Sequence, residues 1–368
     1  MVAPHIKGAQ RAAAARVELV EATPSVVQPV WAALEPLARP SYFLTWGWVE
    51  TWLDMLPRAD RPLFAVLRDG DRPRATFFLG RRRMLRHGFV SSRSLHLNAT
   101  GSARRDAVCI EHNGILTDGA WSVGDLVAAL PDDWDELFLP GIDAIHAEDP
   151  LPHGLERRLL RDVACPIVEL ERVRSQGYLP LLSANTRQQI KRARRRLGET
   201  TLDVATHLAQ ATAVFDQLID LHGRSWKARG QAGAFADRWF LDLHRALIAR
   251  RFAHGEILLA RLRSGAATVG CVYGLVSYGR VLFYQSGLAS YADAAIKPGL
   301  LAHAALVEHA AAAGHTTYDF LGGDSRYKAS LATDIERLVW MCVRRDLRRF
   351  SFEDRLRRWK RRLAGVRP

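Results

Sequence analysis

Apolar and polar residues follow an order along the chain that predicts alternating helices and strands. The stretch 41–55 is rich in aromatic residues and begins with a serine, which favours a capped helix. Short apolar runs of strand length come next, with Gly70 at the turn between the first two. The strands predicted in this half cover 63–67, 75–79, 94–98, 107–111 and 136–139, and a second helix covers 123–130.

The second half of the chain repeats this order. Its predicted strands cover 257–262, 268–276, 281–286, 316–321 and 338–344, and a helix covers 297–313. Two short sequences also match between the halves: PLFAVLRDG at 62–70 resembles ILLARLRSG at 257–265, and FLPG at 138–141 resembles FLGG at 320–323. Because both matches occur in the same order, we predict an internal duplication that gives two α/β domains of one type.

Between the halves, the pattern over 183–197 predicts a helix with two unlike faces. Ser183 suits its N-cap, and apolar residues recur along one side. Four cations share the opposite side: Arg187, Lys191, Arg194 and Arg195. This row is either a solvated surface or a site for an anion such as a cofactor phosphate or RNA.

Composition narrows the class of protein. The 368 residues suffice for two domains, and 48% hydrophobic with 25% charged residues is ordinary for a globular chain. The four cysteines lack the spacing of a zinc site or a disulfide framework. There is no apolar run of 18 residues and no apolar core of a signal peptide. We therefore expect a reduced, cytoplasmic protein without a metal.

The charge is less ordinary. A formal net charge of +13 predicts attraction to something anionic, such as a phosphorylated cofactor, RNA or an acidic lipid surface. Eleven Lys/Arg stand against three Asp/Glu over 344–367. Within 346–368, apolar residues recur among these cations and predict a basic amphipathic helix. This helix either packs on its domain, lies on an anionic membrane or binds RNA.

Two further segments carry candidate chemistry. His222 and Trp226 lie four residues apart on a predicted helix that runs past Arg229 into a glycine-flanked loop, which suits a substrate cleft. Trp226 alternatively belongs to the core. The segment 297–328 is the more informative. It starts a helix with Lys297-Pro298-Gly299, and the free N–H groups of such a helix start attract anions. Asp319, a Gly-Gly turn, Tyr327 and Lys328 then follow at the sheet edge.

The ordered combination of these motifs resembles a known family. The chain is similar to the acetyltransferase domain of CelD/BcsL-like proteins in the GNAT superfamily. Four segments carry this similarity: the basic helix, LHGRSWKARG at 221–230, the helix start at 298–299 and YDFLGGDSRYK at 318–328. Fem-type peptidyltransferases are related to these. The resemblance covers about 180–345 and more faintly 40–165. It implies two tandem GNAT-like domains, α/β (α+β) in class, each with a mixed, mostly antiparallel sheet flanked by helices.

The resemblance also implies acyl transfer from acetyl-CoA or another acyl-CoA to an amine or hydroxyl. The cofactor-binding positions it implies are Arg187, Lys191, Lys297, Pro298, Gly299 and Leu300. Strand 281–287 would polarise the thioester carbonyl. One departure stands out: the pyrophosphate loop Gln/Arg-x-x-Gly-x-Gly/Ala is missing, and Pro298 lacks an N–H. An acyl-carrier protein or an aminoacyl-tRNA therefore stays open as the donor.

Thioester aminolysis needs a base, an oxyanion donor and a proton for the thiolate. Tyr327 is the candidate proton donor, with packing under the glycine turn as the alternative, and His222 or Asp324 is the candidate base. The candidate substrate-binding residues are Trp226, Arg229, Asp319 and Lys328, together with Asn98, His112 and Asn113 at predicted strand ends of the first half. Asn98, His112 and Asn113 alternatively shape turns.

No serine-hydrolase, P-loop or Rossmann motif is present, which argues against those classes. We predict an N-terminal tail (1–15), a degenerate GNAT-like domain (16–175), an acyltransferase domain (176–345) and a basic helix (346–368). The leading function is acyl-CoA-dependent transfer in envelope polysaccharide or small-molecule biosynthesis. The alternatives are a Fem-like aminoacyl-tRNA-dependent transferase and a non-catalytic scaffold of polysaccharide synthesis.

Overall fold

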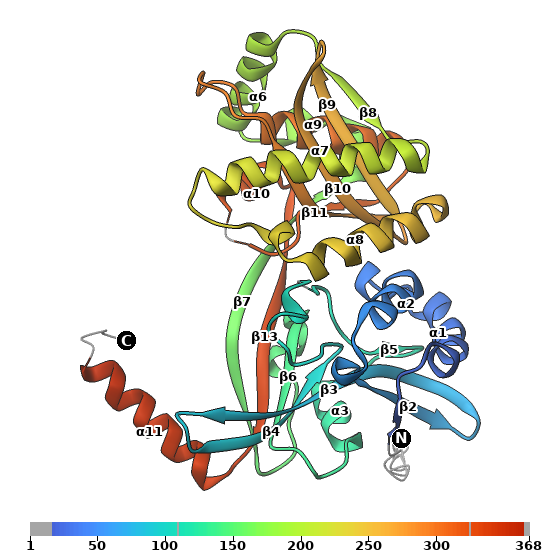
Figure 1. The fold of residues 1–368 in the computed structure, drawn as a ribbon, viewed down its shortest axis with the longest axis vertical. Helices are drawn as coiled ribbons and strands as arrows, with labels where there is room; N and C mark the ends of the chain where they lie inside the picture. Colours follow the sequence, from blue (N-terminus) through green and yellow to red (C-terminus); the bar gives the residue numbers. More distant parts are fainter. Residues whose placement is uncertain (1–16, 109, 324, 364–368) are drawn as a thin grey trace, which may run out of the picture.

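A computed structural model describes residues 17–108, 110–323 and 325–363, and its strands form a single mixed sheet (Figure 1). Each half of the chain has the order β-α-α-β-β-β-α-β-β. The first half consists of β1 (Glu18–Glu21), α1 (Pro24–Ala38), α2 (Trp46–Met55), β2 (Leu63–Asp69), β3 (Arg72–Arg86), β4 (Val90–Leu97), α3 (Val123–Ala129), β6 (Glu136–Asp143) and β7 (Leu155–Glu169), with the short β5 (Leu116–Thr117) beside β3.

The second half has the same order. It consists of β8 (Thr201–Val204), α7 (Leu208–Lys227), α8 (Arg238–Arg251), β9 (Ile257–Ser264), β10 (Ala267–Ser277), β11 (Arg280–Leu288), α9 (Pro298–Ala312), β12 (Thr317–Asp319) and β13 (Asp334–Arg345), with α10 (Arg326–Leu331) before β13. Three helices connect the halves, namely α4 (Leu170–Gln176), α5 (Tyr178–Leu181) and α6 (Ala184–Leu197), and α11 (Arg348–Leu363) follows β13. The repeated order confirms the predicted duplication. The first sequence match falls on the equivalent strands β2 and β9, whereas in the second match FLPG lies within β6 and FLGG directly follows β12.

The last strands of the two halves are exchanged. The strand order is β1-β2-β3-β4-β6-β13-β7-β12-β11-β10-β9-β8, so β13 completes the sheet of the first half and β7 completes that of the second. β7 and β13 pair antiparallel along their lengths and run between the two halves (Figure 1). Each half therefore depends on the other for its final strand. The domain limits given above stay a prediction.

In each half, one pair of parallel strands separates after a short contact. β11 pairs with β12 only through Arg280–Leu282 opposite Thr317–Asp319. β4 pairs with β6 in the same way, over three residue pairs from Ser94 to His96. From Phe283 onward, β11 therefore presents an edge toward β12 that is no longer paired with it. The ladder between β10 and β11 also contains an irregularity beside Tyr273 and Gly274, which places Tyr284 at a bulge.

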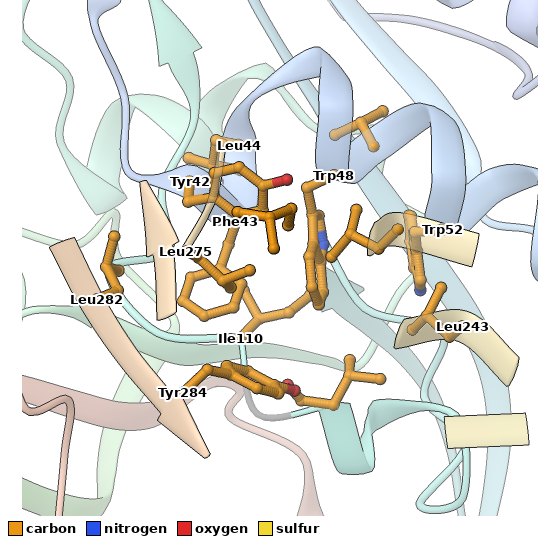
Figure 2. Close-up of a cluster of buried hydrophobic side chains, with 14 of the residues drawn as sticks. Tyr42, Phe43, Leu44, Trp48, Trp52, Ile110, Leu243, Leu275, Leu282 and Tyr284 are labelled. Atoms are coloured by element: carbon orange, nitrogen blue, oxygen red, sulfur yellow. The ribbon is translucent and has the colours of Figure 1, made fainter. Parts of the chain in front are cut away.

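Aromatic side chains from both halves join in one buried cluster (Figure 2). Trp48 and Trp52 of α2 lie in it with Leu243 of α8 and Tyr284 of β11, and Trp48 is 1% exposed. The indole of Trp239 donates to the carbonyl of Met55 at 3.1 Å, which links α8 to the end of α2. Burial of large aromatic surfaces stabilises such a junction strongly. Through this cluster, residues of the first half hold in place the helices that lie over β11.

Two local predictions were wrong. The predicted strand at 107–111 is a 3₁₀ turn at Asp106–Val108, and residues 110 and 111 are not in a strand. The reason is tertiary: the hydroxyl of Tyr284 donates to the carbonyl of Val108 at 2.6 Å. The predicted helix at 41–55 is split, because Thr45 accepts a hydrogen bond from the N–H of Trp48 and starts α2 anew. Within the described ranges, no helix combines the length and apolar character needed to cross a membrane.

Candidate active site

A cleft opens where β11 leaves β12. Two adjoining pockets, of about 840 and 360 Å³, share Ser225, Arg229 and Leu288 as lining residues. The larger pocket reaches Pro298 at the start of α9, and we call it the carrier end. The smaller pocket, the reaction end, is lined by residues from three elements: His222 and Trp226 of α7, Phe283 to Ser286 of β11, and Tyr327 and Lys328 of α10.

The start of α9 offers unused backbone donors to the carrier end. Lys297 is the N-cap residue, its side chain makes no capping hydrogen bond, and the first turn contains no acidic residue. Pro298 lacks an N–H, and the N–H of Leu301 already bonds the carbonyl of Lys297. This leaves the N–H groups of Gly299 and Leu300 as the donors of the first turn. A Cβ at residue 299 would lie 3.2 Å from Cδ1 of Leu288, so glycine keeps the approach open.

The equivalent helix of the first half is closed to an anion. The hydroxyl of Ser122 accepts from the N–H of Asp125 at 3.1 Å, and the N–H of Val123 donates to Asp149 Oδ2 at 2.8 Å. Two carboxylates therefore already stand at the start of α3. Since a second anion would be repelled there, α9 is the better anion site of the two equivalent helices.

His222 lines the reaction end with a free ring nitrogen. Its side chain is 5% exposed and lies against Phe235 and Trp226, at ring-centre distances of 5.0 and 5.7 Å. Its Nδ1 atom is buried and has no hydrogen-bond partner among the residues that the structure describes. Burial, together with the charge of Arg229, lowers the pKa of His222, so the ring is neutral at neutral pH and its nitrogen can accept a proton.

A tight loop holds this ring in place. Gly233 has a φ of +76°, and a Cβ there would lie 2.8 Å from Cε1 of His222 and 3.0 Å from Cγ of Trp226. The loop backbone thus covers both rings directly, which is possible for glycine alone. The guanidinium of Arg229 stacks 4.9 Å from the Trp226 ring centre and bonds the hydroxyl of Ser225 at 2.6 Å. Trp226 is half-buried and its neighbour Arg229 is exposed at the cleft.

Tyr327 faces the same pocket from α10. It is 37% exposed, and burial raises the pKa of its hydroxyl to about 12, so it keeps its proton at neutral pH. Its ring stacks on His303, with centres 5.9 Å apart and 26° between the planes. His303 is fully buried, its Nδ1 meets the Tyr318 hydroxyl at 2.9 Å, and burial lowers its pKa to about 3. A neutral, fixed imidazole therefore supports the Tyr327 ring.

Lys328 belongs to the same wall. Its Nζ donates to the carbonyl of Gly322 at 3.1 Å and lies 5.7 Å from the Phe283 ring centre. Asp324, the second candidate base, lies outside the described residues. The cleft thus brings together His222, Trp226, Arg229, Tyr327 and Lys328 from two distant segments of the chain.

Asp319 and His112 meet elsewhere, at the junction between the halves. Asp319 is fully buried and accepts hydrogen bonds from His112 Nε2 at 2.7 Å and from Arg280 Nε at 2.9 Å. Burial alone would raise its pKa, but the bond from His112 and the charge of Arg280 lower the pKa of Asp319 to about 2. His112, Asp319 and Glu336 have ligand atoms within 4.8 Å of one another, and the guanidinium of Arg280 bonds both carboxylates there. That guanidinium supplies the positive charge that a metal ion would otherwise supply.

The other predicted residues of the first half are bonded within the fold. Asn98 donates to Asn113 Oδ1 at 2.8 Å and accepts from the N–H of Phe78, while Asn113 donates to the carbonyls of Leu97 and Pro140. On α6, Arg187 donates to the carbonyl of Leu182 at 3.3 Å, and Lys191 is exposed.

Sequence reasoning missed one buried polar group behind the cleft. His244 of α8 is fully buried, with its two ring nitrogens 3.2 Å from the hydroxyls of Tyr273 and Tyr284. Tyr284 lines the reaction end, so this contact fixes one wall of the cleft. A histidine at a core position of an amphipathic helix was the available signal, but its partners lie on strands 29 and 40 residues away.

Three features define the fold as a tandem GNAT-like fold. These are the two α/β halves in tandem, the separation of β11 from β12, and the exposed start of α9 beside that separation. Sequence comparison agrees, since residues 184–329 match the model of the family described as acetyltransferase (GNAT) domain. Residues 184–329 are thus similar to a GNAT acetyltransferase domain.

Solved structures show the same fold over most of the chain. A conserved protein from Bacteroides thetaiotaomicron aligns with a TM-score of 0.54 at 13% identity, covering 89% of this chain and 100% of that one. A crystal structure of FemX aligns with a TM-score of 0.53 at 9% identity, covering 88% and 96% of the two chains. At these identities the likeness concerns the fold. No curated protein matches the sequence significantly.

Proposed function

We propose that the protein transfers an acyl group, with acetyl as the leading candidate, from an acyl-CoA to an amine or hydroxyl acceptor in the cleft beside β11. The observation that carries this proposal is the contrast between the two helix starts. At α9 the N–H groups of Gly299 and Leu300 have no acceptor within the described ranges, whereas at α3 carboxylates already fill the same place.

The carrier end fits the phosphates of CoA. Two backbone N–H groups and the positive end of the α9 dipole favour an anion, and Arg224 and Arg229 line the same pocket. Lys297 is exposed next to this helix start. Bound there, CoA would supply the acyl group as a thioester. The arrangement would direct its acyl end along the unpaired edge of β11, where backbone N–H groups can polarise the thioester carbonyl.

His222 and Tyr327 are suited to the two proton transfers. The acceptor amine or hydroxyl attacks the carbonyl carbon and gives its proton to the neutral ring of His222. The C–S bond then breaks, and Tyr327 protonates the leaving thiolate, which yields acylated acceptor and free CoA. Trp226, Arg229 and Lys328 line the space left for the acceptor.

An aminoacyl-tRNA donor is the second candidate. It is favoured by the net charge of +13 and by Pro298, which leaves only two N–H groups in the first turn of α9. In that case the exposed cations of α6, including Lys191, would meet the RNA backbone.

A thermal-shift titration separates the donors. Acetyl-CoA at micromolar concentration is expected to raise the unfolding midpoint, with a smaller or no effect of tRNA at the same concentration. A shift with tRNA that vanishes at high salt, without a shift from acetyl-CoA, would support the second candidate instead. No shift with either ligand would point to a non-catalytic scaffold and contradict both proposals.

A further inference from the structure

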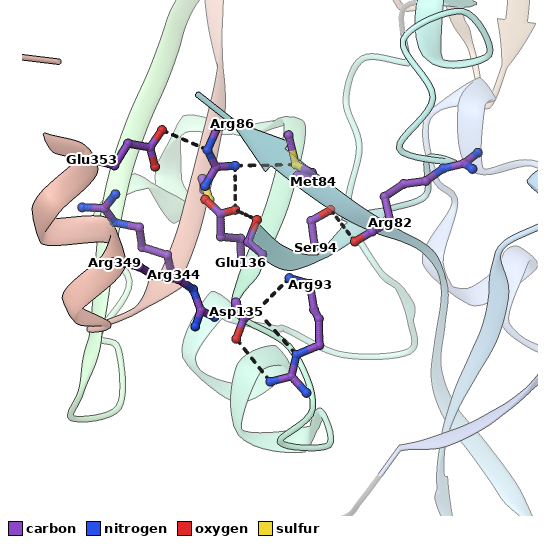
Figure 3. Close-up of polar contacts among 12 residues, drawn as sticks. Arg82, Met84, Arg86, Arg93, Ser94, Asp135, Glu136, Arg344, Arg349 and Glu353 are labelled. Carbon is purple, nitrogen blue, oxygen red and sulfur yellow. Dashed lines mark hydrogen bonds and ion pairs between the residues drawn. The ribbon is translucent and has the colours of Figure 1, made fainter. Parts of the chain in front are cut away.

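The helix α11 is docked to the first half through its acidic residues (Figure 3). Glu353 is 1% exposed and accepts from Arg86 Nε at 2.9 Å, and Asp354 accepts from Arg158 at 2.7 Å and from Arg344. Phe350 is buried on the same side at 1% exposure. On the inward side of α11, both carboxylates are therefore bonded to residues outside the helix.

The outward side of α11 combines aromatic rings with cations. Phe352 is 54% exposed and Trp359 is 57% exposed. Arg348, Arg355 and Arg358 are exposed as well, and none of these three forms an ion pair with another described residue. Residues 348, 352, 355 and 359 follow helical spacing, so rings and guanidinium groups share one side of the helix.

A second element extends this surface. Phe89, at the turn between β3 and β4, is 57% exposed, and its ring lies edge-on to Phe352 with centres 5.9 Å apart. The hairpin of β3 and β4 reaches the start of α11 (Figure 1). We call Phe89, Phe352 and Trp359, together with Arg348, Arg355 and Arg358, the α11 face. Three large rings that stay more than half exposed are costly in water and mark an interaction surface.

We propose that the α11 face binds the surface of a bilayer containing anionic lipids. Aromatic rings enter the boundary between headgroups and acyl chains, and arginines beside them meet the lipid phosphates. This occupant uses both kinds of side chain. A second copy of the chain is disfavoured, because two such faces would bring like charges together. Duplex RNA is disfavoured, because phosphate contacts use the cations and leave the three rings in water.

The test is cosedimentation of the full chain with vesicles. Phosphatidylcholine vesicles with about one third phosphatidylglycerol are compared with pure phosphatidylcholine vesicles. We expect binding to the anionic vesicles alone and its loss in about 0.5 M salt, where screening shortens the reach of charges to a few ångströms. The double variant Arg355→Gln/Arg358→Gln is expected to lower partitioning about 25-fold, since each cation near such a surface contributes about fivefold.

A matched variant controls for net charge. Arg192→Gln/Arg195→Gln removes two exposed cations from α6 instead and is expected to change partitioning less than about threefold. Phe352→Ser/Trp359→Ser is expected to lower partitioning at least about tenfold, because the rings no longer enter the membrane. All these side chains are exposed, and unchanged thermal midpoints will show that the variants fold.

Three results would overturn the proposal. One is equal partitioning of the α11 and α6 charge variants, which would show that vesicle binding depends on net charge alone. Another is retention of tRNA by the α11 face with no vesicle binding. The third is a dimer in solution that Phe352→Ser/Trp359→Ser converts to a monomer, which would assign the face to a second copy.

Discussion

Substitution of Arg280 by methionine tests the charged cluster that anchors β12 at the junction. Arg280 is the cation between Asp319 and Glu336, and the Asp319 side chain is 0% exposed. Methionine keeps most of the side-chain volume but removes the charge. Of its bonds to described residues, Asp319 would then keep those from His112 and from the N–H of Leu321.

The expected loss is about 3 kcal/mol in the free energy of unfolding. Removal of one partner from a buried ion pair costs about 3–5 kcal/mol, because the other charge stays buried without compensation. The bond from His112 keeps the value at the lower end of that range. Arg337 of β13 provides a matched control, since its pair with Asp162 is 55% and 39% exposed. Arg337→Met should cost less than about 1 kcal/mol.

Urea unfolding followed by circular dichroism measures both variants. A midpoint that falls clearly for Arg280→Met and barely for Arg337→Met supports the assignment. A loss below about 1 kcal/mol for Arg280→Met would refute it, since Asp319 would then be held adequately by its other partners or reached by water.

Three further predictions address single residues. The folded-state pKa of Asp319, about 2, lies below the ordinary 3.8, so the stabilisation by its ionised form is complete above pH 4 and is lost as the pH falls from 4 to 2. In urea unfolding, the wild type should therefore lose about 2 kcal/mol more than Asp319→Asn over this range. Equal losses for the two proteins would contradict the pairing of Asp319. Tyr327→Phe should lower kcat about 10²-fold or more in an acyl-transfer assay at an unchanged thermal midpoint, whereas wild-type turnover would exclude it as the proton donor. Gly287→Ala should lower the unfolding midpoint, because its Cβ would lie 2.3 Å from the carbonyl oxygen of Leu218 on α7. Gly119→Ala, which has open space around it, should leave the midpoint unchanged. Equal midpoints for the two variants would show that α7 can shift at no cost.

Local sequence signals predicted those elements that depend on their own residues. Gly70 and Gly265 have φ values of +58° and +56° at the two hairpin turns, as strand–glycine–strand patterns require. Ser183 accepts from the N–H of Thr186 and starts α6 as its capping pattern predicts. Pro298 likewise occupies the first turn of α9. The order of these locally determined elements along the chain was sufficient to predict the GNAT-like fold.

Pairing between distant segments could not be predicted. β7 was missed because its first half reads LERRLLRD, in which charged residues break the alternation of a strand, and it becomes a strand by pairing with β13. His112 was interpreted as a substrate ligand, yet it bonds Asp319, 207 residues away. By contrast, His222 and Trp226 share the cleft with Tyr327 as the helical spacing and the motif order suggested.

The most direct test of the central claim is calorimetric titration of CoA into the wild type and two glycine variants. Gly299→Asp places a carboxylate at the start of α9, as Asp149 stands at α3, and the added Cβ would contact the flexible side chain of Leu288 at 3.2 Å. Gly119→Asp adds the same charge at an open surface position. We predict micromolar binding by the wild type and Gly119→Asp, and at least about tenfold weaker binding by Gly299→Asp. Equal affinities for all three proteins, or no binding of CoA by the wild type, would contradict an acyl-CoA site at this cleft.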